Sequence, residues 1–211
     1  NAYMPKKLGG ITYGVHLGQV YTDYSTGSFK VTDNTTDFAI DGNGFFAIAF
    51  TDKQGNTSVK YTRDGSFTVN TEGYLVTKDG DYVLNATGAM NGDPSRNNFI
   101  QVDPNATVTV NKMGYVIQND QVVGTLGVVD VDNYDYLEKY GENMYNLLDG
   151  GNRIATDAKV EQGVLETSNV NVVNEMVNMI TIQRAYEANQ KVITSIDSTL
   201  DRAVNNVGRV Q

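Results

Sequence analysis

The sequence predicts a mainly β protein: a β-sandwich-like or barrel-like body of short antiparallel strands and hairpins, followed by one long C-terminal amphipathic helix. Two observations support this fold class. Between residues 11 and 165, short apolar stretches alternate with turns rich in Gly, Asn and Asp, a pattern typical of short strands. Between Gly163 and Gly208 the chain has no Gly and no Pro, and apolar residues recur at steps of three and four, the pattern of a helix that buries one side.

The body is expected to begin at residue 11. Residues 11–17 alternate apolar and polar side chains, which predicts a half-buried strand. Further strands are predicted at 29–31, 37–40, 45–50, 58–63, 66–70, 74–77, 82–84, 99–102, 107–110, 115–117, 121–131 and 159–165. Residues 86–96, rich in Gly, Asn and Asp, are expected to form a loop, and residues 136–140 a short helical turn.

Five residues are predicted to hold turns of the body. Gly42 and Gly44 supply the positive φ of a tight turn before the apolar strand at 45–50. The pair Asp64-Gly65, with Arg63 before it, is expected to form a type I′ hairpin turn that joins strands 58–63 and 66–70. The Gly-x-Gly pattern does not indicate a phosphate loop, because a strand follows it and no third glycine has the required spacing.

Composition excludes several functional classes. The chain has 211 residues, a net charge of −9 and no basic cluster, which disfavours nucleic-acid binding through phosphate neutralisation. No apolar run approaches the roughly 18 residues of a membrane span, so we expect no direct membrane insertion. The chain has no Cys, and its one His, His16, lies on the polar face of the strand predicted at 11–17 and is expected to be an ordinary surface residue, so neither Cys–His nor Ser–His catalysis is expected. We therefore expect no catalytic residue, no cofactor and no metal.

Acidic residues raise two functional possibilities, a calcium-binding loop and a pair of carboxylates that acts on glycans. Asp130, Asp132 and Asp135 cluster after the strand at 121–131, but Tyr134 and Asp135 occupy positions where a calcium loop needs an oxygen ligand and a Gly, so an acidic turn is predicted. Two carboxylates that face each other across a cleft need no fixed spacing in the sequence. A glycan-binding or glycan-cleaving β domain of the cell envelope is therefore kept as a second hypothesis.

The C-terminal helix is predicted over residues 171–207, with a length of about 55 Å at 1.5 Å per residue. Its apolar seam is the candidate subunit interface, and we expect the partner of this seam to lie outside the chain's own helices, because no other stretch is helical on this scale. The alternative is that the seam packs on the β body. Asn189 in the seam is expected either to set the register of pairing or to be exposed. The predicted interface residues are Met176, Met179, Ile182, Tyr186, Asn189, Ile193, Ile196, Leu200, Ala203 and Val207.

Several stretches resemble one family, the bacterial flagellar hook–basal body proteins, which comprise the rod and hook proteins of the axial structure. Residues 161–180, which include Ser-Asn-Val-Asn-Val-Val-Asn-Glu-Met-Val-Asn-Met-Ile, are similar to the family's C-terminal signature, and residues 183–187 continue it. Residues 37–46 resemble its Gly-x-Gly-Phe-Phe element. Residues 61–67 resemble its Tyr-Thr-Arg-Asp-Gly-x-Phe hairpin, and residues 141–145 the segment before the C-terminal region.

The resemblance implies a structural role without cofactor or chemistry. In this family, N- and C-terminal helices pair as an inner coiled coil, neighbouring subunits stack into a hollow shaft that transmits torque, and the β domain faces outward. The unbroken run at 168–180 is most similar to distal rod members, with a proximal rod or hook subunit as the alternative. The implied domains are a lead-in and first strand at 1–36, an outward β domain at 37–149, a linker at 150–170 and a coiled-coil helix at 171–207.

The family's N-terminal helix, and the Asn-rich segment ending in Gly-Phe-Lys that follows it, are not found after Asn1; residues 1–24 resemble the part that comes next. The expected partners are copies of the chain and neighbouring axial proteins, and without the N-terminal helix the chain is expected to be a monomer or weak oligomer. The expected location is the flagellar basal body, outside the cytoplasmic membrane. Export by the flagellar type III apparatus depends on the N-terminal region in this family.

Overall fold

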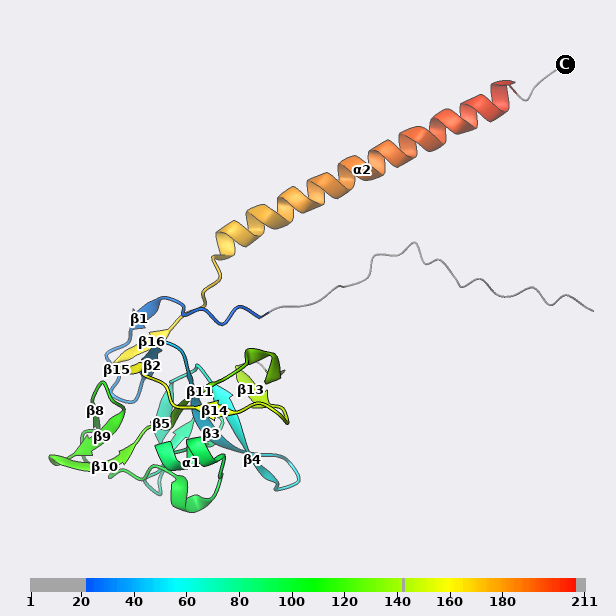
Figure 1. The fold of residues 1–211 in the computed structure, drawn as a ribbon. Coiled ribbons are helices and arrows are strands. Elements are labelled where there is room, and N and C mark those ends of the chain that lie inside the picture. The colour runs from blue at the N-terminus through cyan, green and yellow to red at the C-terminus, as the bar shows by residue number, and fades with distance from the viewer. Residues whose placement is uncertain (1–21, 142, 208–211) are drawn as a thin grey trace, which may run out of the picture.

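The computed structural model describes residues 22–141 and 143–207, so the strand predicted at 11–17 and His16 lie outside the described residues. A β body occupies one end of the molecule and a single long helix, α2, projects from it (Figure 1). The predicted fold class, a mainly antiparallel β body followed by one long C-terminal helix, is confirmed.

The strands of the body are short. In chain order they are β1 Phe29–Val31, β2 Phe38–Asp41, β3 Phe45–Thr51, β4 Thr57–Thr62, β5 Phe67–Val69, β6 Leu75–Thr77, β7 Tyr82–Val83, β8 Thr109–Val110, β9 Tyr115–Gln118, β10 Gln121–Thr125, β11 Val128–Val131, β12 Leu137–Tyr140, β13 Met144–Leu147, β14 Arg153–Ile154, β15 Lys159–Gln162 and β16 Val164–Glu166. The helices are α1 Ala86–Asn91 and α2 Val172–Val207, with 3₁₀ turns at Arg96–Asn98 and Tyr134–Tyr136.

Strand β3 lies in the centre of the largest sheet, whose strands run β12-β13-β4-β3-β7-β6-β5. One edge of β3 pairs with β4, and the other edge pairs with β11 near Phe46 and with β7 near Ile48. Side chains along β3 alternate between the two hydrophobic cores of the body: Phe46 packs in one, while Phe45 and Ala47 pack in the other. The continuous apolar run of β3 therefore reflects a strand that is buried on both faces.

The smaller sheets bring distant parts of the chain together. Strand β1 pairs with β16, and β2 pairs with β15. The first two strands of the body therefore lie beside its last two strands. Strands β8, β9 and β10 form a separate antiparallel sheet. Strand β14 pairs with β11, and through it residues 153–154 join the largest sheet.

The predicted hairpin at Asp64-Gly65 is wrong. Strand β4 pairs with β3 and β13, whereas β5 pairs with β6, so the strands on either side of Gly65 are not neighbours. Gly65 passes directly over β2: a Cβ built on it would lie 1.9 Å from the carbonyl oxygen of Phe38, and the Phe38 N–H donates to the Gly65 carbonyl at 3.0 Å. The glycine is needed here for close backbone approach and not for a positive φ.

Gly42 and Gly44 have the predicted positive φ, at 126° and 139°. The turn does not join paired strands, because β2 pairs with β15 and β3 with β4, β7 and β11. It carries the chain from one sheet to the next. Backbone conformation was thus predicted from local sequence, but strand pairing was not, since pairing depends on residues far along the chain.

Other predicted elements also differ. Residues 86–91 form helix α1 and not a loop, because the Asn85 side chain accepts from the Gly88 N–H at 2.8 Å and Gly92 adopts the left-handed conformation at its end. Residues 137–140 form strand β12 and not a helical turn, because they pair with β13, which was not predicted. The predicted strand at 121–131 is split into β10 and β11, 159–165 is split at Gly163, and 99–102 makes isolated bridges only.

Helix α2 begins one residue later than predicted and ends at the predicted residue. The Asn171 side chain accepts from the backbone N–H groups of Val173 and Asn174, at 3.0 and 3.2 Å, which satisfies donors at the first turn. No Gly or Pro interrupts the 36 residues that follow.

Candidate assembly surface

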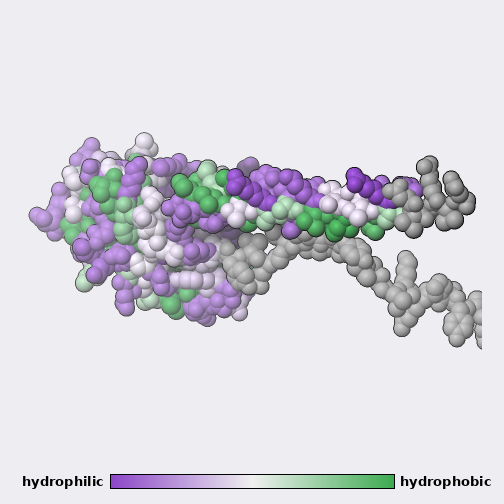
Figure 2. Space-filling view, turned by 90° about the horizontal axis from the view of Figure 1, so that it is seen from above, coloured by the Kyte–Doolittle hydropathy of each residue, from purple (hydrophilic) through white to green (hydrophobic). Residues whose placement is uncertain are grey.

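Helix α2 exposes its whole described surface. Every side chain from Val172 to Asn205 is exposed to solvent. Apolar residues gather along one side of the helix and hydrophilic residues along the opposite side (Figure 2). In proteins most of the stability of a helix comes from packing of its amphipathic face, so the exposed apolar side of α2 is a surface that packing would stabilise.

The predicted seam lies on this surface. Its seven large apolar side chains are between 54% and 70% exposed: Met176, Met179, Ile182, Tyr186, Ile193, Ile196 and Leu200. Asn189 and Ala203 are also exposed, and Val207 lies within the bounds of α2. The alternative that the seam packs on the β body does not hold for the described residues, because packing on the body would bury these side chains.

A wholly exposed apolar stripe of this length is unusual for a monomer. Large exposed apolar patches mark interaction sites, and the stripe extends along α2 with no charged residue in the seam itself. A helix with an apolar seam and a polar opposite face is suited to pairing with other helices. The exposed seam is therefore the candidate assembly surface of the described chain.

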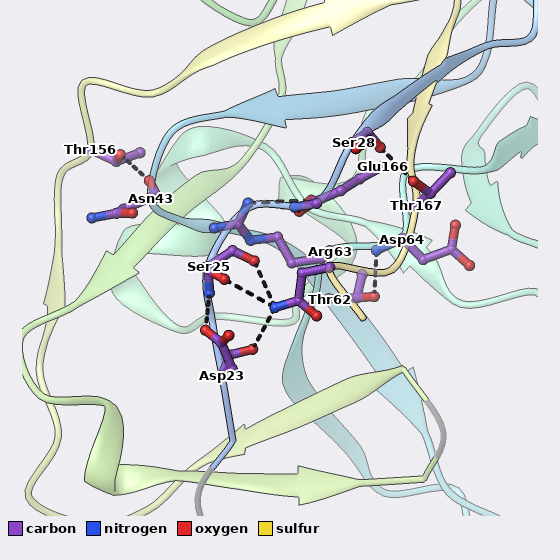
Figure 3. Close-up of polar contacts among 12 residues, drawn as sticks. Asp23, Ser25, Ser28, Asn43, Thr62, Arg63, Asp64, Thr156, Glu166 and Thr167 are labelled. Atoms are coloured by element: carbon purple, nitrogen blue, oxygen red, sulfur yellow. Dashed lines mark hydrogen bonds and ion pairs between the residues drawn. The ribbon is translucent and has the colours of Figure 1, made fainter. Parts of the chain in front are cut away.

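The segment that enters the body and the segment that leaves it meet at one place, which we call the neck: residues 23–28 and 166–169. The Thr167 N–H and its Oγ1 hydroxyl both donate to the Ser28 carbonyl at 2.8 Å. Glu166 accepts from the Gly27 N–H at 2.8 Å and forms an ion pair with Arg63 at 3.3 Å (Figure 3). The segment that enters the body and the segment that leaves it therefore lie side by side.

Tyr24 anchors the incoming segment of the neck. Its ring lies 4.9 Å from the Tyr134 ring, 5.5 Å from the Tyr145 ring and 6.1 Å from the Phe45 ring, between centroids. Burial raises the pKa of the Tyr24 hydroxyl above its ordinary value. Burial, with a hydrogen bond to the Asp130 carboxylate, raises the pKa of Tyr134 to about 12, so both tyrosines are neutral at physiological pH.

Two predicted turn residues have long-range roles that the sequence did not reveal. Arg63 lies over the Phe45 ring, 5.4 Å from its centroid, and pairs with Glu166. Asp64 accepts from the Ser66 N–H at 2.9 Å and from the Asn143 side-chain amide at 3.1 Å. Arg63 and Glu166 each belong to a stretch that resembled the flagellar family, but 103 residues separate them and no local pattern indicates that they meet.

Acidic residues at the C-terminal end of β11 accept hydrogen bonds from the body. Asp130 accepts from the Tyr134 hydroxyl at 2.8 Å, and Asp132 accepts from the N–H and side-chain amide of Asn152 at 3.0 and 2.9 Å. The described residues contain no group of three or more His, Cys, Asp or Glu side chains placed to hold a metal ion. Over residues 22–141 and 143–207, no helix is long and apolar enough to cross a membrane.

A β body with a long, exposed, amphipathic helix at its C-terminal end, and no metal-binding cluster in the described residues, is typical of a structural protein. Comparison with known proteins supports this class. Residues 39–118 match the family described as flagellar hook protein FlgE/F/G D1 domain, and residues 161–206 match the family described as flagellar basal body rod FlgEFG protein C-terminal.

The chain is also similar to whole rod proteins. It is 37% identical to the flagellar basal-body rod protein FlgF of Caulobacter vibrioides, over 90% of this chain and 73% of the relative. It is 37% identical to FlgG of Buchnera aphidicola subsp. Schizaphis graminum and 33% identical to FlgG of Bacillus subtilis, over 92% of this chain and 74% of each relative. The chain therefore belongs to the flagellar basal-body rod protein family.

Family membership has direct consequences for the hypotheses drawn from the sequence. The predicted resemblance is confirmed, and so is the prediction that the chain is not an enzyme, because this family is structural. The chain is a structural subunit of the flagellar rod, located in the basal body. A glycan-cleaving activity is excluded for the same reason.

Proposed function

We propose that this protein is a subunit of the distal rod and that it polymerises, through the seam of α2, into the hollow shaft that transmits torque from motor to hook. The observation that carries the proposal is the exposure of the seam along the whole of α2. The unbroken run from Ser168 to Ile180 supports a distal position within the family. A proximal rod position is the second candidate, because relatives named FlgF and FlgG are equally similar, at 37% identity.

In the proposed assembly, α2 packs against the family's N-terminal helix and against the helices of neighbouring copies. The seam residues from Met176 to Val207 make these contacts. Residues 37–149 face outward, and residues 150–170 connect them to the helical core. The neck supports this arrangement, because it releases the N-terminal segment beside the start of α2: the Asn169 side-chain amide donates to the Asp23 carbonyl at 3.3 Å. In this proposal the protein reaches the rod by export through the flagellar type III apparatus.

Deletion of the gene tests the function and the position. Under the proposal, mutant cells do not swim, and their basal bodies retain a proximal rod but have no distal rod and no hook. Electron microscopy of purified basal bodies distinguishes the outcomes. Basal bodies without any rod would assign the protein to the proximal position, and complete hooks in a non-swimming mutant would refute the rod assignment.

A further inference from the structure

The neck joins three parts of the molecule through one carboxylate. Glu166 ends β16, and its two oxygens have different partners: Oε1 accepts from the Gly27 N–H of the incoming segment, and Oε2 pairs with Nη1 of Arg63, directly after β4. The incoming segment, the outgoing segment and the largest sheet are therefore tied together at this residue. Figure 3 shows the Arg63 and Glu166 side chains extending toward each other between these segments.

This ion pair is shielded from solvent. Its side chains are 18% and 10% exposed, whereas the ion pair of Arg96 with Glu72 on the same body is 72% and 59% exposed. Pairs that are withdrawn from water are screened less by salt and are held in one geometry. The Arg63 guanidinium is further fixed by its position over the Phe45 ring.

The two segments of the neck approach each other more closely than side chains allow. A Cβ built on Gly27 would lie 1.8 Å from the Thr167 carbonyl oxygen, so only glycine fits at this position. Two residues past this contact, Asn169 donates from its amide to the Ser25 carbonyl at 3.2 Å and to the Ser25 hydroxyl at 3.1 Å. The contacts continue the antiparallel pairing of β1 with β16 up to the point where the segments separate.

Within the described residues, the neck is also the connection between α2 and the body. All side chains from Val172 to Asn205 are exposed, so α2 does not rest on the body. A force that acts on the body reaches α2 through residues 166–171. Hydrogen bonds join residues 166–169 to residues 23–28, and the ion pair of Glu166 with Arg63 joins both segments to the end of β4 in the largest sheet.

We infer that Arg63, Glu166 and Gly27 form a mechanical clasp that couples the β body to α2, so that force applied to the body is transmitted to the helical core. The inference rests on the proposed rod function for its biological meaning. It assigns positioning roles to three residues that sequence patterns placed in turns or left unassigned.

Hydrogen–deuterium exchange of the full-length protein tests the clasp itself. Arg63→Met removes the cation, and Glu166→Gln removes the negative charge while it keeps an acceptor for the Gly27 N–H. Each variant is expected to exchange about tenfold faster in residues 22–31 and 164–171, with exchange in β3 unchanged. The double variant should exchange no faster than either single variant, because both changes break the same pair.

Glu72→Gln is the matched control, because it removes the same charge from an exposed ion pair on the same body, and it should leave the exchange of residues 22–31 and 164–171 unchanged. Unaltered exchange in both Arg63→Met and Glu166→Gln would overturn the clasp. An increase in the exchange of residues 22–31 and 164–171 in Glu72→Gln as large as in the two test variants would overturn it as well. Glu166→Gln keeps the test decisive if Arg63→Met fails to fold.

Swimming under load tests the mechanical role. In a strain that depends on the gene, cells with Arg63→Met should form as many hooks as the parent but lose about twofold more speed in viscous medium, whereas cells with Glu72→Gln should match the parent. An unchanged response to viscosity, or a loss of hooks, would overturn the mechanical coupling. Normal swimming after deletion of the whole gene would refute the proposed function instead, which the exchange experiment does not address.

Discussion

Ile193→Asp in the seam of α2 tests the assembly surface most directly. The Ile193 side chain is 60% exposed, so its burial in the rod should contribute about 1–2 kcal/mol, that fraction of the roughly 1.5–3 kcal/mol for full burial. A carboxylate buried there without a partner costs about 3–5 kcal/mol more. Together these effects, about 4–7 kcal/mol, predict subunit association weaker by a factor of about 1,000 to 100,000.

The assay is assembly of the full-length variant in a deletion strain, with hooks counted by electron microscopy. Cells with Ile193→Asp should form no hooks, while the purified variant keeps the melting temperature of the β body, because Ile193 does not contact the body. Ser195→Asp is the matched control: it adds the same charge about 200° further around the helix, on the polar face, and should assemble.

Normal hooks in cells with Ile193→Asp would refute the seam as an interface. Equal failure of Ser195→Asp would refute the assignment of the interface to one face of α2. A lowered melting temperature of the β body in Ile193→Asp would contradict the exposed position of this side chain.

Two further changes probe the body. Gly65→Ala places a Cβ against the Phe38 carbonyl and should destabilise the body by about 1–3 kcal/mol, measured by urea unfolding; unchanged stability would show that the crossing over β2 is looser than described. Hydrogen bonds from the side chain and backbone of Asn56 lower the pKa of Asp52 below its ordinary value of 3.8. Its carboxylate therefore stabilises the turn above that pH, and the effect is lost as the pH falls through the folded-state pKa. Asp52→Asn should be less stable than the parent at pH 7, and the difference should shrink as the pH falls below 3.8; a difference that does not change with pH would contradict the charge effect.

Local sequence was sufficient where structure depends on neighbouring residues. The helix at 172–207 was predicted to within one residue at its start, because an uninterrupted apolar periodicity and the Asn171 cap are properties of consecutive residues. The positive φ values of Gly42 and Gly44 were predicted for the same reason. Most strands of the body were also located, since turn residues mark their ends.

Local sequence patterns did not predict which strands pair with each other. Asp64-Gly65 has the composition of a hairpin turn, yet β4 and β5 are not neighbours, because β3 and β13 occupy the two edges of β4. The segment after Tyr136 was predicted to be helical, yet it pairs with β13. In each case hydrogen bonds to residues distant in sequence outweigh the local preference.

The candidate assembly surface was likewise predicted in part from the sequence and decided in part by the tertiary structure. Its seam was found from the sequence, because the spacing of apolar residues along a helix determines which side chains share a face. That the seam is exposed, and does not pack on the body, is decided by the tertiary structure. The contacts of the neck are decided entirely by the tertiary structure, because Arg63 and Glu166 meet only when β4 and β16 have formed in separate sheets.

The sequence by itself determined that this protein is a β body with one amphipathic helix, that the helix carries an apolar seam, and that several stretches of the chain resemble the flagellar axial family. Tertiary structure alone decided how the strands pair, why Gly27 and Gly65 must be glycines, and how the body holds the two segments from which the chain emerges. The physical reason is the distance along the sequence between the residues that interact. Periodicity and capping act within a few residues, whereas strand pairing, close backbone contact and a shielded ion pair join residues that only folding brings together.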